Sequence, residues 1–469
     1  MSIDALTAAY KRRDVSVEEI VLQAFDRIDA IDGKLRIFTY TDRQAALAQA
    51  RKTDDGYRRG ARLGPLAGIT FSVKDNIPVA GKPLTFGSGL LQGNVAQEDH
   101  IVVARLMRAG AIFIGMTNLP EFAQKPTNEN AFYGTGRNPW DLARTPGGSS
   151  GGGAASVATG VVAIGLGTDA GGSVRTPAAC CGVLGIKATH GLIPASDLIE
   201  GFSSLSQPGP MTRTVADLAR TIDVIAGKDE GDPWSYAVAP QSLRQSAVAR
   251  GDLKSMRIAW LPLVGNQRLD GEVRQSCEAV LRQLETLGAV IEEHFVDLSA
   301  SSAIMAPIAG ALNRHRFKKL IRENLDDLDP LFRRRLLTAA DDTAADLQQA
   351  LVDRTTYFRM VQRWFDNFDV LITPTLSAPP VAADADPAAS LIIDGFACGP
   401  LRTQWINYCH PFNVSGNPAL TVPAGWTASN LPIGIQLAGP WYGEARLLRI
   451  AAEIEAFAPW AQRSLPVCA

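Results

Sequence analysis

Histidine and cysteine are scarce in this chain, which has five of the first and six of the second among 469 residues. The histidines are scattered, and no two cysteines have the CxxC spacing. Zinc and other transition metals need such side chains grouped at short spacings. We therefore expect no metal site, and we expect the cysteines to be buried thiols of a protein in the reducing cytoplasm.

An excess of one charge is also lacking. The chain has 46 Lys and Arg residues against 48 Asp and Glu residues, for a formal net charge of −2. Nucleic-acid binding depends on clustered positive charge, so this balance argues against a nucleic-acid partner.

Long apolar runs are missing as well. Residues 1–14 mix acidic and basic side chains and lack the apolar core of a signal peptide. Residues 145–168 carry no charge, but they are too rich in Gly, Ser and Thr to cross a membrane. We expect a cytoplasmic protein with no membrane partner.

What the chain does contain is the composition of a globular protein, with 46% hydrophobic and 20% charged residues. Buried strand patterns such as Val161–Leu166 alternate with amphipathic helix patterns such as Val215–Ala226. Neither a clear linker nor a repeat interrupts them. The alternation predicts one large α/β domain over residues 1–469, with helices around a central sheet.

Two regions have a helical pattern. The N-terminal segment, about 1–60, includes a capping box at Ser16–Glu19 that is followed by apolar residues at helical spacing. Residues from about 303 to 368 are strongly helical and highly charged, which predicts an insertion outside the sheet. Because loops and lids usually set substrate preference, we expect this insertion to cover the mouth of a binding pocket.

Glycine is abundant around two serine-bearing turns, Gly147–Gly151 and Gly171–Ser173. Glycine lets backbone N–H groups approach a reacting atom closely because it has no Cβ. The first turn matches the G-x-S-x-G nucleophile elbow, but a loop precedes it where an elbow needs a strand, and a flexible linker is the other interpretation. The second follows a predicted strand, so its N–H groups are candidates for an oxyanion hole, with an ordinary glycine turn as the alternative.

Lys74 follows another predicted strand, residues 66–73. A lysine taken alone is most often a solvated surface residue. Burial at the end of an apolar strand lowers the pKa of a lysine, and a lysine that is neutral near pH 7 can act as a base. A triad based on histidine stays open as well, although no motif selects any of His100, His190, His294, His315 and His410.

Together these segments resemble the amidase signature family of serine hydrolases. The resemblance covers nearly the whole chain and is weakest across residues 230–370. The matching segments are GGSSGG at 147–152, GTDAGGSVR at 167–175, PAA at 177–179, CGV at 181–183, GIK at 185–187, VKDN at 73–76, TNLPEF at 117–122, NEN at 128–130, GNPA at 416–419 and LPIGIQL at 431–437.

The resemblance implies a Ser–Ser–Lys triad in a single α/β domain with a central mixed sheet. Ser173 is then the nucleophile, Lys74 is the base, unprotonated in the free enzyme, and Ser149 transfers the proton between them. The peptide bond between Gly148 and Ser149 is expected to be cis. The backbone N–H groups expected to form the oxyanion hole are those of Ala170, Gly171, Gly172 and Ser173, and the expected supporting residues are Ser150, Asp169 and Arg175.

The implied reaction is hydrolysis of a carboxamide or related C–N bond through an acyl-enzyme, releasing an acid and ammonia or an amine. It needs no metal or organic cofactor, and its expected substrate is a small-molecule amide. A homodimer is expected only because it is the commonest oligomer. The alternatives are the glutaminase (A-type) subunit of a tRNA-dependent amidotransferase, or of another multi-subunit amide hydrolase, and a non-catalytic binding protein with the same fold.

One segment departs from the resemblance. Gln124-Lys125-Pro126 stands where the family more often has small residues. We hypothesise that Lys125 faces the substrate and favours a polar or anionic group, with a surface lysine as the alternative. The sequence also leaves open whether five aromatic residues line an acyl pocket or pack in the core: Trp364, Phe365, Trp405, Tyr408 and Phe412.

Overall fold

The computed structural model describes residues 1–195, 204–237 and 242–468. The strands of its main sheet are β1 Phe38–Thr41, β2 Thr70–Lys74, β3 Ile112–Thr117, β6 Ile164–Asp169, β7 Leu184–Lys187, β8 Gln207–Thr212, β9 Arg257–Trp260, β10 Val290–Glu293, β11 Val370–Pro374, β14 Ala419–Trp426 and β15 Pro432–Ala438. In the described residues these form one 11-stranded sheet, in the order β1-β3-β2-β6-β8-β7-β14-β15-β11-β9-β10. Two hairpins form separate sheets: β4 Glu129–Asn130 with β5 Gly134–Thr135, and β12 Ser390–Ile393 with β13 Phe396–Pro400.

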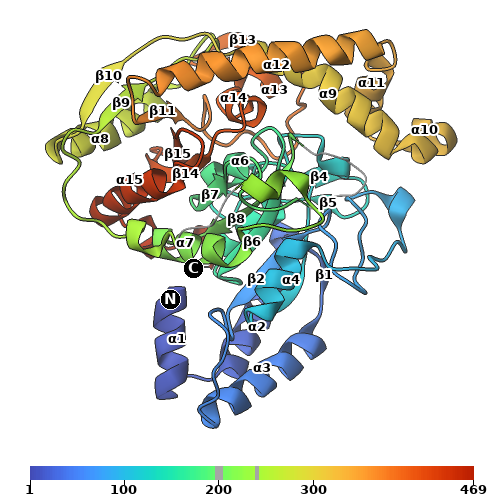
Figure 1. Cartoon of the computed structure of the whole chain (residues 1–469). Helices are drawn as coiled ribbons and strands as arrows, with labels where there is room; N and C mark the ends of the chain where they lie inside the picture. The colour runs from blue at the N-terminus through green and yellow to red at the C-terminus, as the bar shows by residue number, and fades with distance from the viewer. Residues whose placement is uncertain (196–203, 238–241, 469) are drawn as a thin grey trace.

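Helices surround this sheet (Figure 1). The group nearest the N-terminus, at the bottom of the view, is α1 Ile3–Arg12, α2 Val17–Leu35 and α3 Arg43–Arg58. The other α-helices outside the insertion are α4 Ile101–Arg108, α5 Gly151–Ala158, α6 Arg175–Cys181, α7 Val215–Ile225, α8 Gly271–Thr286, α13 Leu401–Gln404, α14 His410–Val414 and α15 Glu444–Phe457. The predicted α/β fold with a central mixed sheet is confirmed.

The predicted helical insertion consists mainly of helices joined by short turns. Its helices are α9 Ala300–Arg316, α10 Lys318–Asn324, α11 Pro330–Thr338 and α12 Ala344–Trp364, at the top of Figure 1. The N-terminal segment differs from the prediction in one respect, since it contains the edge strand β1, which pairs antiparallel with β3. Its sequence, Phe-Thr-Tyr-Thr, is made of aromatic and β-branched residues that suit a strand.

Parallel pairing brings the ends of two central strands together. β2 pairs parallel with β6, and Val73 is opposite Leu166. Parallel neighbours end at the same edge of a sheet, so Lys74 at the end of β2 lies beside the last residues of β6, Thr168 and Asp169. Every residue of β2 is buried, which places the Lys74 side chain in the interior.

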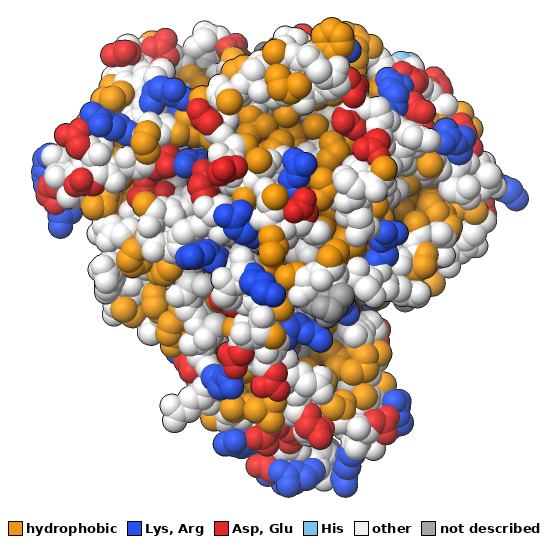
Figure 2. All heavy atoms as spheres, turned by 180° about the vertical axis from the view of Figure 1, so that it is seen from behind, with side chains coloured by type: hydrophobic (Ala, Val, Ile, Leu, Met, Phe, Trp, Pro, Cys, Tyr) orange, Lys and Arg blue, Asp and Glu red, His pale blue; other side chains and the backbone are white. Residues whose placement is uncertain are grey.

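The surface of the molecule has charges of both signs. In the face seen from behind in Figure 2, Lys and Arg side chains are interspersed with Asp and Glu side chains and with apolar groups. Among the described residues, no helix combines the length and the apolar character that crossing a membrane requires. The cysteines described as free thiols are all buried, as expected, and are Cys180, Cys181, Cys277, Cys398 and Cys409.

Candidate active site

Lys74 reaches two hydroxyl groups inside the protein. Its Nζ lies 2.7 Å from Ser149 Oγ and 3.0 Å from Thr168 Oγ1, and it is completely inaccessible to solvent. Thr168 Oγ1 also accepts a hydrogen bond of 3.0 Å from Asn76 Nδ2. The lysine therefore sits among hydroxyls, with no carboxylate paired to it among the described residues.

Burial lowers the pKa of Lys74 to about 7. The cost of placing a charged ammonium away from water is the main cause, and the negative charge of Asp169 opposes it in part. A large fraction of Lys74 is therefore neutral near pH 7. A neutral amine that is hydrogen-bonded to a hydroxyl is able to accept the proton of that hydroxyl.

Ser149 lies in a tight loop, and the position before it, Gly148, has room only for glycine. The peptide bond between Gly148 and Ser149 is cis, which confirms that prediction. A Cβ on Gly148 would lie 2.2 Å from the carbonyl oxygen of Thr127, so no larger residue fits there. Ser150 follows as the N-cap of α5, and its N–H donates a 3.1 Å hydrogen bond to the carbonyl oxygen of Ser173. The two serine-bearing turns are thus in direct contact.

The turn at Ala170–Ser173 leaves β6 and precedes α6. Gly172 has φ +109°, and a Cβ there would lie 2.5 Å from the Cβ of Cys409. The Gly172 N–H donates to Asp169 Oδ1 at 2.7 Å. This hydrogen bond corrects the expectation for Gly172, because an amide that is bonded to a carboxylate is not free to bind an oxyanion. Within the described residues, the amides of Ala170, Gly171 and Ser173 donate to no protein acceptor.

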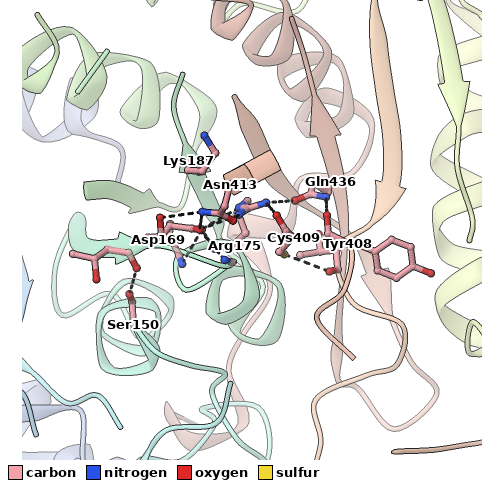
Figure 3. A network of polar contacts seen from close by, with 12 residues as sticks. Ser150, Asp169, Arg175, Lys187, Tyr408, Cys409, Asn413 and Gln436 are labelled. Carbon is pink, nitrogen blue, oxygen red and sulfur yellow. Dashed lines mark hydrogen bonds and ion pairs between the residues drawn. The ribbon is translucent and has the colours of Figure 1, made fainter. Parts of the chain in front are cut away.

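Asp169 and Arg175, which flank this turn in the sequence, form a buried ion pair (Figure 3). Arg175 donates to the carboxylate from Nε at 3.0 Å and from Nη2 at 2.9 Å, and both side chains are completely buried. Burial alone would raise the pKa of Asp169. The charge of Arg175, with hydrogen bonds from Arg175, Asn413 and Gly172, outweighs burial and holds that pKa well below its ordinary value.

The C-terminal part of the chain completes this network. Arg175 Nη1 donates to Gln436 Oε1 at 2.7 Å and to the Cys409 carbonyl oxygen at 3.0 Å. Asn413 Nδ2 donates to Asp169 Oδ1 at 2.9 Å, and its own Oδ1 accepts from Arg175 Nη2 at 2.5 Å. Figure 3 shows these side chains converging on the guanidinium from α14 and β15. The turn at Ala170–Ser173 is therefore held, through Asp169 and Arg175, by hydrogen bonds to elements that lie far away in the sequence.

A cavity of about 110 Å³ opens beside Ser173. One wall consists of residues from the two serine turns, namely Gly148, Ala170, Gly171 and Ser173. Another comes from α9, through Met305, Ala309, Leu312 and Asn313, and the remaining lining residues are Ala123, Gln124, Lys125, Pro126, Leu205, Ser206, Arg335, Arg402 and Ile406. Because α9 and α11 contribute residues, the helical insertion does border this cavity.

Lys125 lines the cavity, but its ammonium group already has two acidic partners. Its Nζ lies 2.8 Å from Glu129 Oε1 and 2.6 Å from Asp329 Oδ2. With both carboxylates present, Lys125 carries no surplus positive charge for a substrate. The geometry argues against Lys125 as the receptor of an anionic group, because the local charge is already compensated.

The aromatic candidates belong to the core. Trp405, Tyr408 and Phe412 are completely buried in apolar clusters, and Trp364 and Phe365 pack against the cluster that contains Tyr408. Aliphatic and polar residues line the cavity beside Ser173 in their place. Core packing was the alternative that the sequence left open, and it is what the structure shows.

The histidine alternative finds no support in the site. His410 packs against the Gly171 turn, where a Cβ on Gly171 would lie 3.1 Å from its Cδ2, but its Nδ1 is hydrogen-bonded to Ser302 Oγ at 3.1 Å. Burial is the largest cause that lowers the pKa of His410 to about 3, so its ring is a poor base. His190, whose pKa burial also lowers to about 3, is hydrogen-bonded to Gln207.

Several residues of the site carry no clear signal in the sequence. Thr168 lies inside the GTDAGGS motif, so its position was the signal that could have revealed its contact with Lys74. Gln436 lies in the closing segment at 431–437, whereas nothing in the sequence around Asn413 indicates its contact with Asp169. Arg335 and Arg402 reach the cavity from two separate helices, and no motif marks either of them.

A lysine that is neutral near pH 7 and bonded to a serine hydroxyl is typical of hydrolases that activate a serine nucleophile without histidine. Comparison with known proteins identifies the particular group. The model of the Amidase family matches residues 19–448, and the chain belongs to this family.

Relatives and solved structures agree with this assignment. An acylamidase of Rhodococcus erythropolis is 34% identical over 465 residues, which cover 99% of this chain and 96% of the relative. The glutamyl-tRNA(Gln) amidotransferase A subunit of Carboxydothermus hydrogenoformans is 34% identical over 97% of this chain and 96% of its own length. The crystal structure of a bacterial aryl acylamidase of the amidase signature family superposes with a TM-score of 0.90 at 27% identity, covering 99% of both chains.

The enzyme is therefore an amidase with Ser–Ser–Lys chemistry. It hydrolyses a carboxamide or a related C–N bond other than a peptide bond. Members of this family act on small amide substrates.

Proposed function

We propose that Ser173 is the nucleophile of this amidase, that Lys74 is its base and that Ser149 transfers the proton between them. The observation that carries the proposal is the 2.7 Å hydrogen bond between Lys74 Nζ and Ser149 Oγ, made by a buried lysine whose pKa burial lowers to about 7. A serine hydroxyl is a weak nucleophile until a base removes its proton.

In the proposed first half-reaction, Ser173 Oγ attacks the carbonyl carbon of the substrate. Its proton passes to Ser149 Oγ, and Ser149 gives its own proton to Lys74 Nζ. When the tetrahedral intermediate collapses, the C–N bond breaks, and the proton returns from Lys74 through Ser149 to the departing nitrogen. Water then attacks the acyl-enzyme by the reverse route and releases the acid.

The negative oxygen of the tetrahedral intermediate is assigned to the turn that begins at Ala170. Its donors are the amides of Ala170, Gly171 and Ser173, which have no acceptor among the described residues. The amide of Gly172 keeps its hydrogen bond to Asp169 and so holds the turn in shape. Donors held in place before the reaction stabilise the developing charge without the cost of reorganisation.

Three further residues are assigned to support this turn. Ser150 ties the Ser149 loop to Ser173 through its backbone N–H and donates from Oγ to the Thr168 carbonyl oxygen at 3.4 Å. Asp169 binds the amides of Gly172 and Val174, and Arg175 holds Asp169. These contacts fix backbone positions, so their proposed role is positioning.

We also propose that one domain, residues 1–469, acts without another subunit, as a single chain or a homodimer. The N-terminal segment, about 1–60, belongs to this domain, and the insertion at about 303–368 covers the pocket mouth, as its cavity-lining residues support. The buried free cysteines support a location in the cytoplasm. The second candidate, the glutaminase component of an amidotransferase, is favoured by the similarity to amidotransferase A subunits.

Labelling of the purified protein with a serine-directed fluorophosphonate tests the assignment of Ser173. We expect one labelled peptide that contains Ser173, no label in Ser173→Ala, and hydrolysis of simple amides by the wild-type chain without ATP. Label on another serine would overturn the assignment. Hydrolysis that requires partner chains would favour the glutaminase component.

A further inference from the structure

Two arginines line the cavity that contains Ser173. Arg335 lies on α11 and Arg402 on α13, and both side chains are largely shielded from solvent. Both also line a second, outer cavity of about 420 Å³, together with Asn313. The two arginines therefore border both cavities.

Neither arginine has an acidic partner among residues 1–195, 204–237 and 242–468. Their side-chain hydrogen bonds go to one neutral residue, since Arg335 Nη1 donates to Gln124 Oε1 at 2.5 Å and Arg402 Nη1 donates to the Gln124 carbonyl oxygen at 2.9 Å. Asp342 lines the outer cavity but forms no ion pair with either of them. Within the described parts of the chain, most of the five N–H groups of each guanidinium thus have no protein acceptor.

Lys125, which lines the same cavity, differs from the arginines because its charge is balanced by acidic side chains. It is paired with two carboxylates, Glu129 and Asp329, whereas the two arginines, which are half-buried like Lys125, have none. The two arginines together carry two positive charges that no described side chain balances. Uncompensated like charges in a partly buried cavity are costly unless an anion joins them.

We propose that Arg335 and Arg402 bind a carboxylate of the substrate, so that the enzyme prefers amides that carry a carboxylate close to the scissile bond. This inference rests on the proposed role of Ser173. Guanidinium groups match a carboxylate with paired N–H donors, and charge-assisted bonds of this kind are stronger than neutral ones. The carboxylate belongs either to the acyl part of the substrate or to its leaving amine.

The pKa of Arg402 agrees with this placement of two cations in one cavity wall. Burial is the main cause that lowers the pKa of Arg402, and the charge of Arg335 lowers it further. Because these cations repel each other, an anion between them gains attraction to both. The small volume of the inner cavity, about 110 Å³, favours a short chain between the carboxylate and the scissile carbonyl.

Matched substrates test the preference and show on which side the carboxylate lies. Succinamate with butyramide tests the acyl side, and N-acetylglycine with N-ethylacetamide tests the amine side, because in each pair a methyl group replaces the carboxylate. We expect kcat/KM for the charged member of one pair to exceed that of the neutral member by roughly 10- to 100-fold, mainly through KM. Equal values in both pairs, or preference for the neutral members, would overturn the proposal.

Substitutions identify the residues that produce the preference. Arg335→Gln and Arg402→Gln are each expected to reduce the ratio of kcat/KM for the charged amide to that for the neutral amide by about 10-fold or more. Arg334→Gln is the matched control, because Arg334 is an exposed neighbour on α11 that lines only the outer cavity. A control variant that loses the preference as fully as Arg335→Gln would contradict the assignment of the site.

A binding measurement separates this inference from the proposed chemistry. Calorimetric titration of Ser173→Ala with succinamate and N-acetylglycine needs no turnover, and we expect one of them to bind and to lose affinity in the Ser173→Ala, Arg335→Gln double variant. Failure of both to bind would overturn the carboxylate site even if Ser173 is labelled by fluorophosphonate. Binding without any labelling of Ser173 would instead overturn the proposed nucleophile.

Discussion

Lys74 and Lys187 are two buried lysines at the ends of strands in the same sheet, and burial is the main cause that lowers the pKa of each to about 7. Their partners differ. Lys74 Nζ meets the hydroxyls of Ser149 and Thr168, whereas Lys187 Nζ donates to the carbonyl oxygen of Ala188 at 2.7 Å. A hydroxyl has a proton to give to a neutral amine, and a carbonyl oxygen has none. The partner of a buried lysine, and not its pKa alone, therefore identifies the base.

We expect the two lysines to differ most in their effect on kcat/KM. Lys74→Met removes the proposed base and should lower kcat/KM by at least about 1,000-fold, because a positioned general base contributes that order of rate. Lys187→Met should leave kcat/KM within a few-fold of wild type in the folded protein. The measurement is steady-state hydrolysis of one neutral amide, with circular dichroism to establish folding. Comparable losses of kcat/KM in both variants would contradict the conclusion that the partner of a buried lysine identifies the base.

Asp169 influences both lysines, since its charge raises the pKa of each against the effect of burial. Asp169→Asn leaves the buried guanidinium of Arg175 without a carboxylate, which should lower the free energy of unfolding by about 3–5 kcal/mol. Urea denaturation measures this change. Asp141→Asn is the control, because its ion pair with Arg144 is exposed, and it should change stability by less than about 1 kcal/mol.

The pH dependence of activity should follow the protonation of Lys74 and not that of Lys187. Because only the neutral amine accepts a proton, kcat/KM for a neutral amide should fall about tenfold for each pH unit below a pKa of about 7. The same acid limb should persist in Lys187→Met. A flat profile between pH 5 and pH 8 is the result that would exclude Lys74 as the base.

The pH dependence of stability should in turn report Lys187. Its pKa is about 7 in the folded protein and near 10.5 when unfolded, so between these values the unfolded chain binds more protons. The contribution of Lys187 to stability is therefore fully present above pH 10.5 and is lost as pH falls toward 7. The unfolding free energy of wild type should rise with pH more steeply than that of Lys187→Met, by about 1 kcal/mol per pH unit. Urea denaturation at pH 7.5, 8.5 and 9.5 measures both slopes, which would run parallel if Lys187 stayed charged.

Much of the fold follows from local patterns in the sequence. The apolar runs predict β2, β3 and β6, and the capping box at Ser16 predicts the start of α2. The central strand β8 has no such pattern, because its sequence, QPGPMT, contains Pro208 and Pro210. Alternate residues of a strand direct their N–H groups to the same side, so both prolines lack donors toward one neighbour only. Pairing with β6 and β7 outweighs the poor intrinsic preference of these residues for a strand.

Some residues of the site can likewise be predicted from local sequence, and others cannot. Lys74, Ser149 and Ser173 stand in motifs, so the resemblance to the amidase signature family selects them from the sequence alone. Arg335 and Arg402 depend on how α11 and α13 fold back over the cavity, which no local pattern contains. The charge balance at Lys125 could not be predicted for a related reason, since its partner Asp329 lies about 200 residues away in the sequence and is brought to it only by the fold.

Arg175 connects the turn that carries Ser173 to the C-terminal part of the chain, and this has a consequence for synthesis. A ribosome releases Lys74, Ser149 and Ser173 well before Cys409, Asn413 and Gln436, whose oxygen atoms accept the hydrogen bonds of Arg175. A nascent chain therefore holds the three proposed catalytic side chains while the turn that carries Ser173 still lacks its C-terminal support. Release of the last strands completes that support, so activity should appear only once translation is nearly finished.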